Sequence, residues 1–263
     1  AETRRSGCPQ PLSMDFQLTG VDLTTPLLRD SIRHDGRSGP SMNREIHAYL
    51  EELYRQGRCP NFCGPWFNTL VRGDRITVNM TRSAASALDN RAFAQAEFQL
   101  REDIFALVEL LRERYPEFRE AVIAGTAVSA GVREGRHLAG VHTLTGRELL
   151  RGEDFPDSIA RNAHPVDIHV PAAGVQMLEE MPRAGHIPYR ALISPQLDNL
   201  LAAGRLIAAD SRAHATIRIQ GTAMATGQAA GTAAALCCAA GTAVHDLDTA
   251  ELRRVLHAGG CML

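Results

Sequence analysis

Lysine is absent from this 263-residue chain, and all 28 of its basic residues are arginine. They nearly balance 30 acidic residues, which leaves a net charge of −2. Proteins that bind nucleic acid or anionic membranes normally present an excess of basic residues. The composition therefore argues against both partners, and the exclusive use of arginine points to codon usage in the genome rather than to a function.

Several catalytic and metal-binding signatures are also missing. The chain has no Gly-x-Ser-x-Gly nucleophile elbow and no cysteine–histidine nucleophile pattern. Three residues separate Cys59 from Cys63, whereas zinc and redox pairs usually have two, and no second pair or histidine cluster completes a metal site. We therefore expect no metal site. Cys237 and Cys238 should be compact apolar side chains in a helix.

The sequence also offers little that would take the chain to a membrane or through one. Residues 222–240 carry no charge, but they are mostly Ala, Gly and Thr with Gln228 in the middle, and such a run partitions poorly into lipid. No signal peptide is apparent, so a reducing cytoplasm is the expected location.

The most informative feature that is present lies in the last hundred residues. The apolar run at 200–203, followed by Gly204, predicts a buried strand that ends at a ligand crevice. Residues 220–240 then predict a helix that stops at Gly241. Gly227 and Gly231 should each cost about 1 kcal/mol in a helix interior, which suggests that this helix face packs against a sheet or a ligand.

Local patterns predict the other elements. Strands are expected over residues 13–18, 66–71, 75–80 and 122–132, the second and third as a hairpin. Helices are expected over residues 43–56, from Asp89 or Asn90 to about Arg114, after a Thr145–Glu148 capping box, and from Asp248 or Thr249 to His257.

Several blocks in this order resemble one known family. They are residues 131–136, 155–161, 165–169, 187–190, 216–218 and 224–234. Together they resemble the carboxyl-terminal part of the FAD-dependent oxidoreductase family, related to glucose-inhibited division protein A and fumarate reductase flavoproteins. The resemblance is good over about residues 75–263 and weak over residues 10–75.

A complete member of this family would open with a strand, a Gly-x-Gly-x-x-Gly turn and a helix that holds the FAD pyrophosphate. This fingerprint does not occur in the sequence. We therefore expect a cleaved product, a truncated piece or one subunit of a split flavoprotein. The expected class is α/β: a disordered lead (1–13), an α+β substrate or cap domain (14–145), and the carboxyl-terminal part of a Rossmann-like FAD-binding domain (146–263).

The resemblance implies FAD as the cofactor and a set of residues that contact it. Backbone N–H groups at the start of the helix that begins near Gly221 would face the flavin carbonyl, where negative charge develops on reduction. A packed Gly/Ala helix without a ligand is the alternative. The predicted cofactor-binding residues are Gly204, Arg205, Gly221, Thr222, Ala223 and Met224.

The predicted catalytic residues are arginines that would hold an acidic substrate bidentately and histidines that would move a proton. Arg133 and Arg136 lie three apart in a block that resembles a family segment next to the cofactor. Surface ion pairs with Glu134 or Glu148 are the alternative for these two, and structural roles are the alternative for the histidines. The full set is Arg133, Arg136, Arg190, His169, His214 and Arg218.

The resemblance therefore implies hydride transfer between a small organic substrate and FAD. A second chain or an N-terminal segment would carry the dinucleotide-binding motif, so the chain by itself is expected to be inactive and part of an oligomer. The alternative is a non-catalytic scaffold or binding subunit that needs a separate chain to complete the FAD site.

Overall fold

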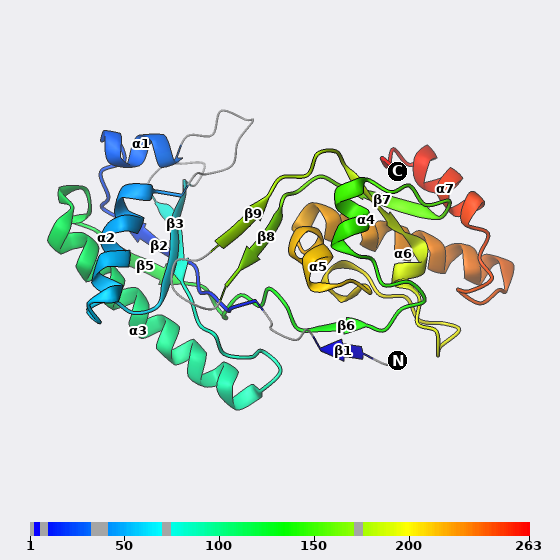
Figure 1. The fold of residues 1–263 in the computed structure, drawn as a ribbon, viewed down its shortest axis with the longest axis horizontal. Helices are drawn as coiled ribbons and strands as arrows, with labels where there is room; N and C mark the ends of the chain where they lie inside the picture. Colours follow the sequence, from blue (N-terminus) through cyan, green and yellow to red (C-terminus); the bar gives the residue numbers. More distant parts are fainter. Residues whose placement is uncertain (1–2, 6–9, 33–41, 70–74, 171–175) are drawn as a thin grey trace. The chain divides into compact units, whose positions relative to one another are not determined.

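The computed structural model describes the chain except for residues 1–2, 6–9, 33–41, 70–74 and 171–175 (Figure 1). Its residues fall into two compact units, each with its own core. The first, called the sheet unit here, comprises residues 10–133 and 169–175. The second, called the α6 unit, comprises residues 1–9, 134–168 and 176–263.

This division differs from the predicted boundary between residues 145 and 146. The chain leaves the sheet unit after Arg133, because strand β6 (Arg136–Leu138) already pairs within the α6 unit. Its partner is strand β1 (Thr3–Arg5), which lies in the stretch expected to be a disordered lead. Other parts of that lead, residues 1–2 and 6–9, lie outside the described residues.

The sheet unit is built on a four-stranded antiparallel sheet of order β3-β4-β2-β5. The predicted hairpin is present, and Phe67 pairs with Val78 across it. The predicted strand over residues 122–132 is shorter in the structure and ends at Thr126. The strands are β2 (Phe16–Thr19), β3 (Phe62–Thr69), β4 (Ile76–Thr81) and β5 (Val122–Thr126).

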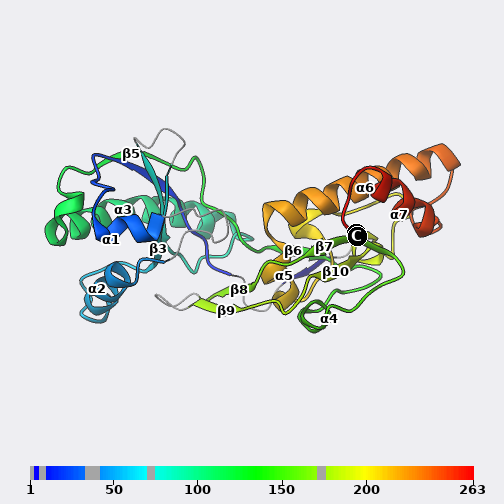
Figure 2. The ribbon, with the colours of Figure 1, turned by 90° about the horizontal axis from the view of Figure 1, so that it is seen from above.

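The long helix of the sheet unit begins where its capping residue predicts, whereas the helix Pro26–Ile32 was not predicted. The Asp89 side chain accepts hydrogen bonds from the N–H groups of Arg91 and Ala92 at the start of α3 (Asn90–Arg114). Figures 1 and 2 show this long helix lying along the sheet. Its buried apolar residues Leu100, Ile104, Leu107, Val108 and Leu111 belong to the core of this unit. The remaining helices are α1 (Pro26–Ile32), α2 (Arg44–Arg55, capped by Asn43) and the 3₁₀ turn η1 (Pro116–Phe118).

The α6 unit combines short antiparallel strand pairs with helices. Besides β1–β6, the pairs are β7–β10 and β8–β9. Thr145 and Glu148 form the predicted capping box of α4, and Asp248 caps α7. The strands are β7 (Ser158–Asn162), β8 (Val166–His169), β9 (Gln176–Glu179) and β10 (Gly185–Pro188). The helices are α4 (Gly146–Arg151), α5 (Ser211–Ile217), α6 (Gln220–Ala240) and α7 (Thr249–Ala258). Two 3₁₀ turns, η2 (Tyr189–Leu192) and η3 (Gly204–Leu206), complete the unit.

The predicted strand at residues 200–203 is wrong. Leu201 makes only a single bridge, to Ile193, and Leu200 is 36% exposed. Gly204 has a left-handed φ of 63° and starts η3, so the chain turns away instead of extending beside a neighbour. The pairs β1–β6 and β7–β10 and those of the four-stranded sheet are all antiparallel, and the fold is mixed α/β with antiparallel sheets.

Helix α6 has the predicted bounds, but its packing differs from the prediction. It ends at Gly241, whose φ of 64° suits the C-cap. A Cβ added at Gly227 or Gly231 would meet nothing within 4 Å, so these glycines lie on an open face. The buried face is formed by Thr222, Thr226, Ala229, Ala233 and Cys237, which recur at helical spacing.

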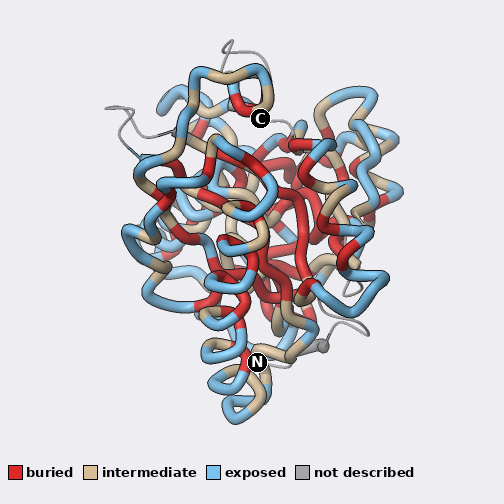
Figure 3. The backbone as a smooth tube through the Cα atoms, turned by 90° about the vertical axis from the view of Figure 1, so that its left-hand side faces the viewer, coloured by how far each residue is buried: buried red, intermediate tan, exposed pale blue. Residues whose placement is uncertain are grey.

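Two clusters of buried side chains form the cores. One lies between the sheet and helices of the sheet unit, and the other surrounds β7, β10 and α6 in the α6 unit. Buried residues are drawn red in Figure 3. No helix in the described part of the chain is both long and apolar enough to cross a membrane.

The open face of α6 can be tested by substitution. Gly227→Ala should raise the free energy of unfolding by up to about 1 kcal/mol, because alanine favours the helix and nothing obstructs its methyl group. Ala233→Leu, on the buried face, should lower it by roughly 1–3 kcal/mol through overpacking. Urea unfolding measures both. A destabilising Gly227→Ala would show that this face is packed.

Candidate functional site

Among the residues that the structure describes, no side chain caps the first backbone N–H groups of helix α6. Its N-cap residue, Ile219, makes no side-chain hydrogen bond, and the N–H of Ala223 donates to the Ile219 carbonyl at 3.0 Å. The N–H groups before Ala223 therefore precede the helical ladder. Gly221 has open space around it and Met224 is 70% exposed, so a ligand can reach the positive end of the helix dipole.

A buried hydrogen-bond network fixes where this helix begins. Asn162, at the end of β7, donates to the Thr216 hydroxyl on α5 at 2.6 Å and accepts from the Thr222 hydroxyl on α6 at 2.8 Å. One turn later, the Thr226 hydroxyl accepts from the Gly204 N–H at 3.0 Å. The four side chains are at most 4% exposed, so water cannot easily replace these partners.

The network brings most of the predicted cofactor-binding residues together. Gly204 lies against α6, since a Cβ there would be 3.5 Å from that of Ala223. Arg205 follows Gly204 in η3 and is exposed. The Thr222 hydroxyl donates to Asn162, so this side chain positions α6, and only the backbone N–H of Thr222 is left to bind a ligand. Sequence reasoning missed Asn162, because only the fold brings it to α6.

Beside this region, two histidines lie in contact in the interior of the α6 unit. His214 on α5 is fully buried, and its ring centroid lies 4.3 Å from that of His137 on β6. Glu134 Oε1 is 3.4 Å from His137 Nε2. Burial, and then the neighbouring His137, lower the pKa of His214 to about 4, against the opposing effect of Glu134. His214 is therefore neutral at physiological pH, and it is poorly suited to accept a proton there.

Two of the arginines predicted to bind substrate form ion pairs with aspartates of the same chain. Arg190 binds Asp157 with two hydrogen bonds, of 3.0 and 3.2 Å. Arg218, at the end of α5, donates to Asp167 at 2.9 Å. Their charges are therefore partly offset, and a substrate carboxylate would have to compete with these ion pairs.

The other predicted catalytic residues belong to different units. Arg136 is exposed on β6 in the α6 unit. Arg133 is half-buried in the sheet unit and donates to the Pro11 carbonyl at 2.8 Å. His169 is the last residue of β8, where the chain passes from the α6 unit into the sheet unit. It is 6% exposed, and its Nδ1 lies 3.1 Å from an Arg82 guanidinium nitrogen. That Arg133 and Arg136 line one pocket stays a prediction.

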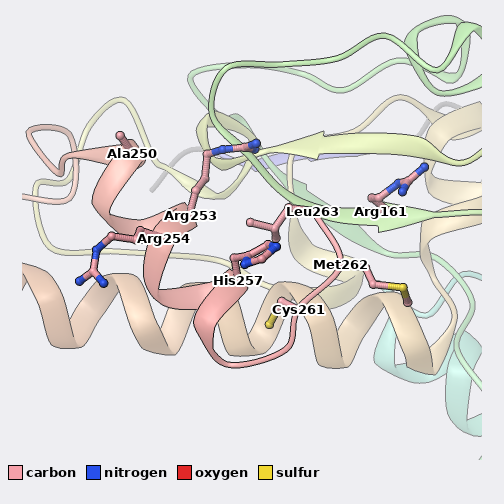
Figure 4. A pocket seen from close by; sticks show the side chains of 8 residues that line it. All are labelled: Arg161, Ala250, Arg253, Arg254, His257, Cys261, Met262 and Leu263. Atoms are coloured by element: carbon pink, nitrogen blue, oxygen red, sulfur yellow. The ribbon is translucent and has the colours of Figure 1, made fainter.

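A separate pocket of about 510 Å³ lies between β7 and α7 (Figure 4). Arg161, Arg253, Arg254 and His257 give it a basic lining. Arg254 is bound to Glu251 by two contacts of 2.7 Å, and Arg253 donates to the Ser158 carbonyl. None of the predicted site residues lines this pocket.

The structure thus defines a mixed α/β protein with an open helix N-terminus next to a glycine turn, a combination suited to an electron-rich or anionic ligand. The profile of the family described as FAD dependent oxidoreductase matches residues 3–256. The chain belongs to this family. No curated protein and no solved structure matches it significantly.

The network makes Asn162 a sensitive position. Asn162→Leu keeps the branched shape but leaves the buried Thr222 hydroxyl without its acceptor, which should cost roughly 1–3 kcal/mol. The Thr216 hydroxyl loses the Asn162 donor but still donates to the His164 carbonyl. Thr232→Val, on a half-buried turn of the same helix, should change stability by less than about 0.5 kcal/mol. Urea unfolding compares the two. Equal effects would show that the network contributes no special stability.

Proposed function

We propose that this chain supplies the substrate-side and flavin-contacting part of an FAD-dependent oxidoreductase that transfers a hydride between a small organic substrate and FAD. The observation that carries the proposal is the open N-terminus of α6, held beside Gly204 by a buried network, in a chain that belongs to this family. When bound, FAD supplies the centre that accepts or donates the hydride.

The residues present suit the isoalloxazine ring of that cofactor. The N–H groups of Gln220, Gly221 and Thr222 are in the first turn of a 21-residue helix, where the dipole favours added electron density on an acceptor atom. Gly221 and Gly204 lack side chains where a planar ring would need close backbone approach. The chain's contribution is thus to bind and orient the ring and to stabilise its negative charge.

Arg136 is the arginine we assign to the substrate. It is exposed on β6, the strand that contacts η3, and it lies in a sequence block that resembles the family. Its permanent charge and forked donors suit a carboxylate. Arg190 and Arg218 have aspartate partners and are better suited to hold the neighbouring loops.

The proposal assigns the pyrophosphate cradle to polypeptide outside these 263 residues, either an N-terminal segment or a second chain. This assignment rests on the sequence, which contains no Gly-x-Gly-x-x-Gly. Riboflavin has the ring but no pyrophosphate. Because the chain would contact only the ring, we expect it to bind riboflavin and FAD with affinities within about fivefold of each other.

The ring contact is tested by two matched glycine variants. A Cβ meets nothing within 4 Å at either Gly221 or Gly231, so the fold should accept leucine at both positions. Gly221→Leu should weaken FAD and riboflavin binding at least about tenfold by covering the helix N-terminus, whereas Gly231→Leu, further along α6, should leave it unchanged.

Flavin fluorescence titration measures both affinities, and thermal unfolding confirms that both variants are folded. Equal affinity in the two variants would place the flavin elsewhere. FAD that stays bound to the pure chain through gel filtration, and binds at least a hundredfold more tightly than riboflavin, would show that the chain itself holds the pyrophosphate.

Substrate binding by Arg136 predicts a graded loss of activity in the assembled enzyme. Arg136→Lys keeps the charge but loses the forked geometry, and Arg136→Ala loses both, so kcat/KM should fall from wild type to Lys to Ala. Arg147→Ala, at an exposed position on α4, is the control and should retain wild-type kcat/KM. Wild-type activity in both Arg136 variants would refute the assignment.

A further inference from the structure

Three potential metal ligands converge inside the α6 unit, although the sequence predicts no metal site. They are Glu134, which precedes β6, His137 on β6 and His214 on α5, and they are 3%, 4% and 0% exposed. One donor atom from each residue can be chosen such that all three lie within 4.8 Å of one another. The flavin region described above does not use Glu134 or His137.

The two imidazoles lack the partners that buried polar groups normally have. Both ring nitrogens of His137 and both of His214 are shielded from solvent and have no hydrogen-bond partner among the described residues. Leaving a buried donor or acceptor unsatisfied is costly, and four such atoms on two touching rings are unusual. A ligand bound between the rings would remove part of this cost.

The spacing suits a metal ion better than a direct hydrogen bond. His137 Nε2 and Glu134 Oε1 are 3.4 Å apart, beyond the usual N–H···O distance of about 2.9 Å. Two donors on one tetrahedral ion, each about 2.1 Å from it, lie roughly 3.4 Å apart. Because the whole set lies within 4.8 Å, its most distant donors would approach by up to about 1.4 Å to reach this spacing, and we expect side-chain rotation to supply this movement.

We propose that Glu134, His137 and His214 bind a divalent first-row transition-metal ion such as Zn²⁺ or Fe²⁺. Two imidazole nitrogens and one carboxylate oxygen are donors that these ions accept readily. The Glu134 carboxylate partly neutralises the charge of the ion, which is costly to bury without a partner of opposite charge. Two arginines, Arg218 and Arg205, also lie close enough to disfavour positive charge at His214. The charge of Arg218 is partly offset by Asp167 at 2.9 Å.

This inference does not depend on the proposed flavin function, and the test needs no flavin. The full chain is treated with a chelator, dialysed and titrated with Co²⁺ or Zn²⁺ alone. We expect about one ion per chain by elemental analysis, and a thermal unfolding temperature that rises with metal concentration. The Co²⁺ form should show weak visible bands of nitrogen and oxygen ligation, without the strong charge-transfer band of a thiolate from one of the cysteines.

Variants assign the site to these residues. His214→Gln and Glu134→Gln should each weaken Co²⁺ binding by about a hundredfold or more, since each removes a direct ligand. His186→Gln is the control, because His186 lies in the same unit and its Nδ1 is 3.2 Å from the Ser158 hydroxyl, outside the cluster. It should bind Co²⁺ as the wild type does.

Each outcome decides the proposal. Less than about 0.1 ion per chain at saturating Co²⁺, a thiolate spectrum, or the same loss in His186→Gln would overturn it and leave the two histidines as a structural pair. If His214→Gln does not fold, the wild-type stoichiometry and spectrum together with Glu134→Gln still decide.

Discussion

The side-chain amide of Asn162 is the interaction on which the C-terminal region depends. It joins the end of β7 to α5 and α6 at once, through hydrogen bonds to Thr216 and Thr222. Both partners are buried, so neither can exchange its hydrogen bond for water without opening the unit. The start of α6 is thereby fixed relative to β7, and Thr226 extends the constraint to the turn at Gly204.

A helix fixed in this way can present its N-terminus without a cap of its own. Most helices satisfy their first N–H groups with a Ser, Thr, Asp or Asn at the N-cap, as α2, α3, α4, α5 and α7 do here. Helix α6 has Ile219 instead, and its stability comes from length and from the buried face around Ala229 and Ala233. The missing cap leaves donors for a ligand, and this is the physical basis of the proposed flavin contact.

The sequence predicted well those features that depend on neighbouring residues. Asp89, Asp248 and the Thr145–Glu148 box located helix starts, and Gly241 located the end of α6, because caps act within one turn. The open side of Gly227 and Gly231 could not be predicted, since it depends on which face of α6 meets β7. Residues 200–203 looked like a strand by hydrophobicity alone, but a strand also needs a neighbour to pair with.

The buried histidine cluster is the clearest case of information that only the fold supplies. Glu134 and His137 lie close in sequence, but His214 reaches them from α5, far along the chain, so no short motif connects the three. The same short helix carries Thr216, which Asn162 holds in place. The Asn162 network therefore fixes α5 as well as α6, and His214 is positioned by the same buried amide that positions the helix N-terminus. A substitution that loosens the network should therefore disturb both the position of His214 and the N-terminus of α6, because a seven-residue helix moves as one body.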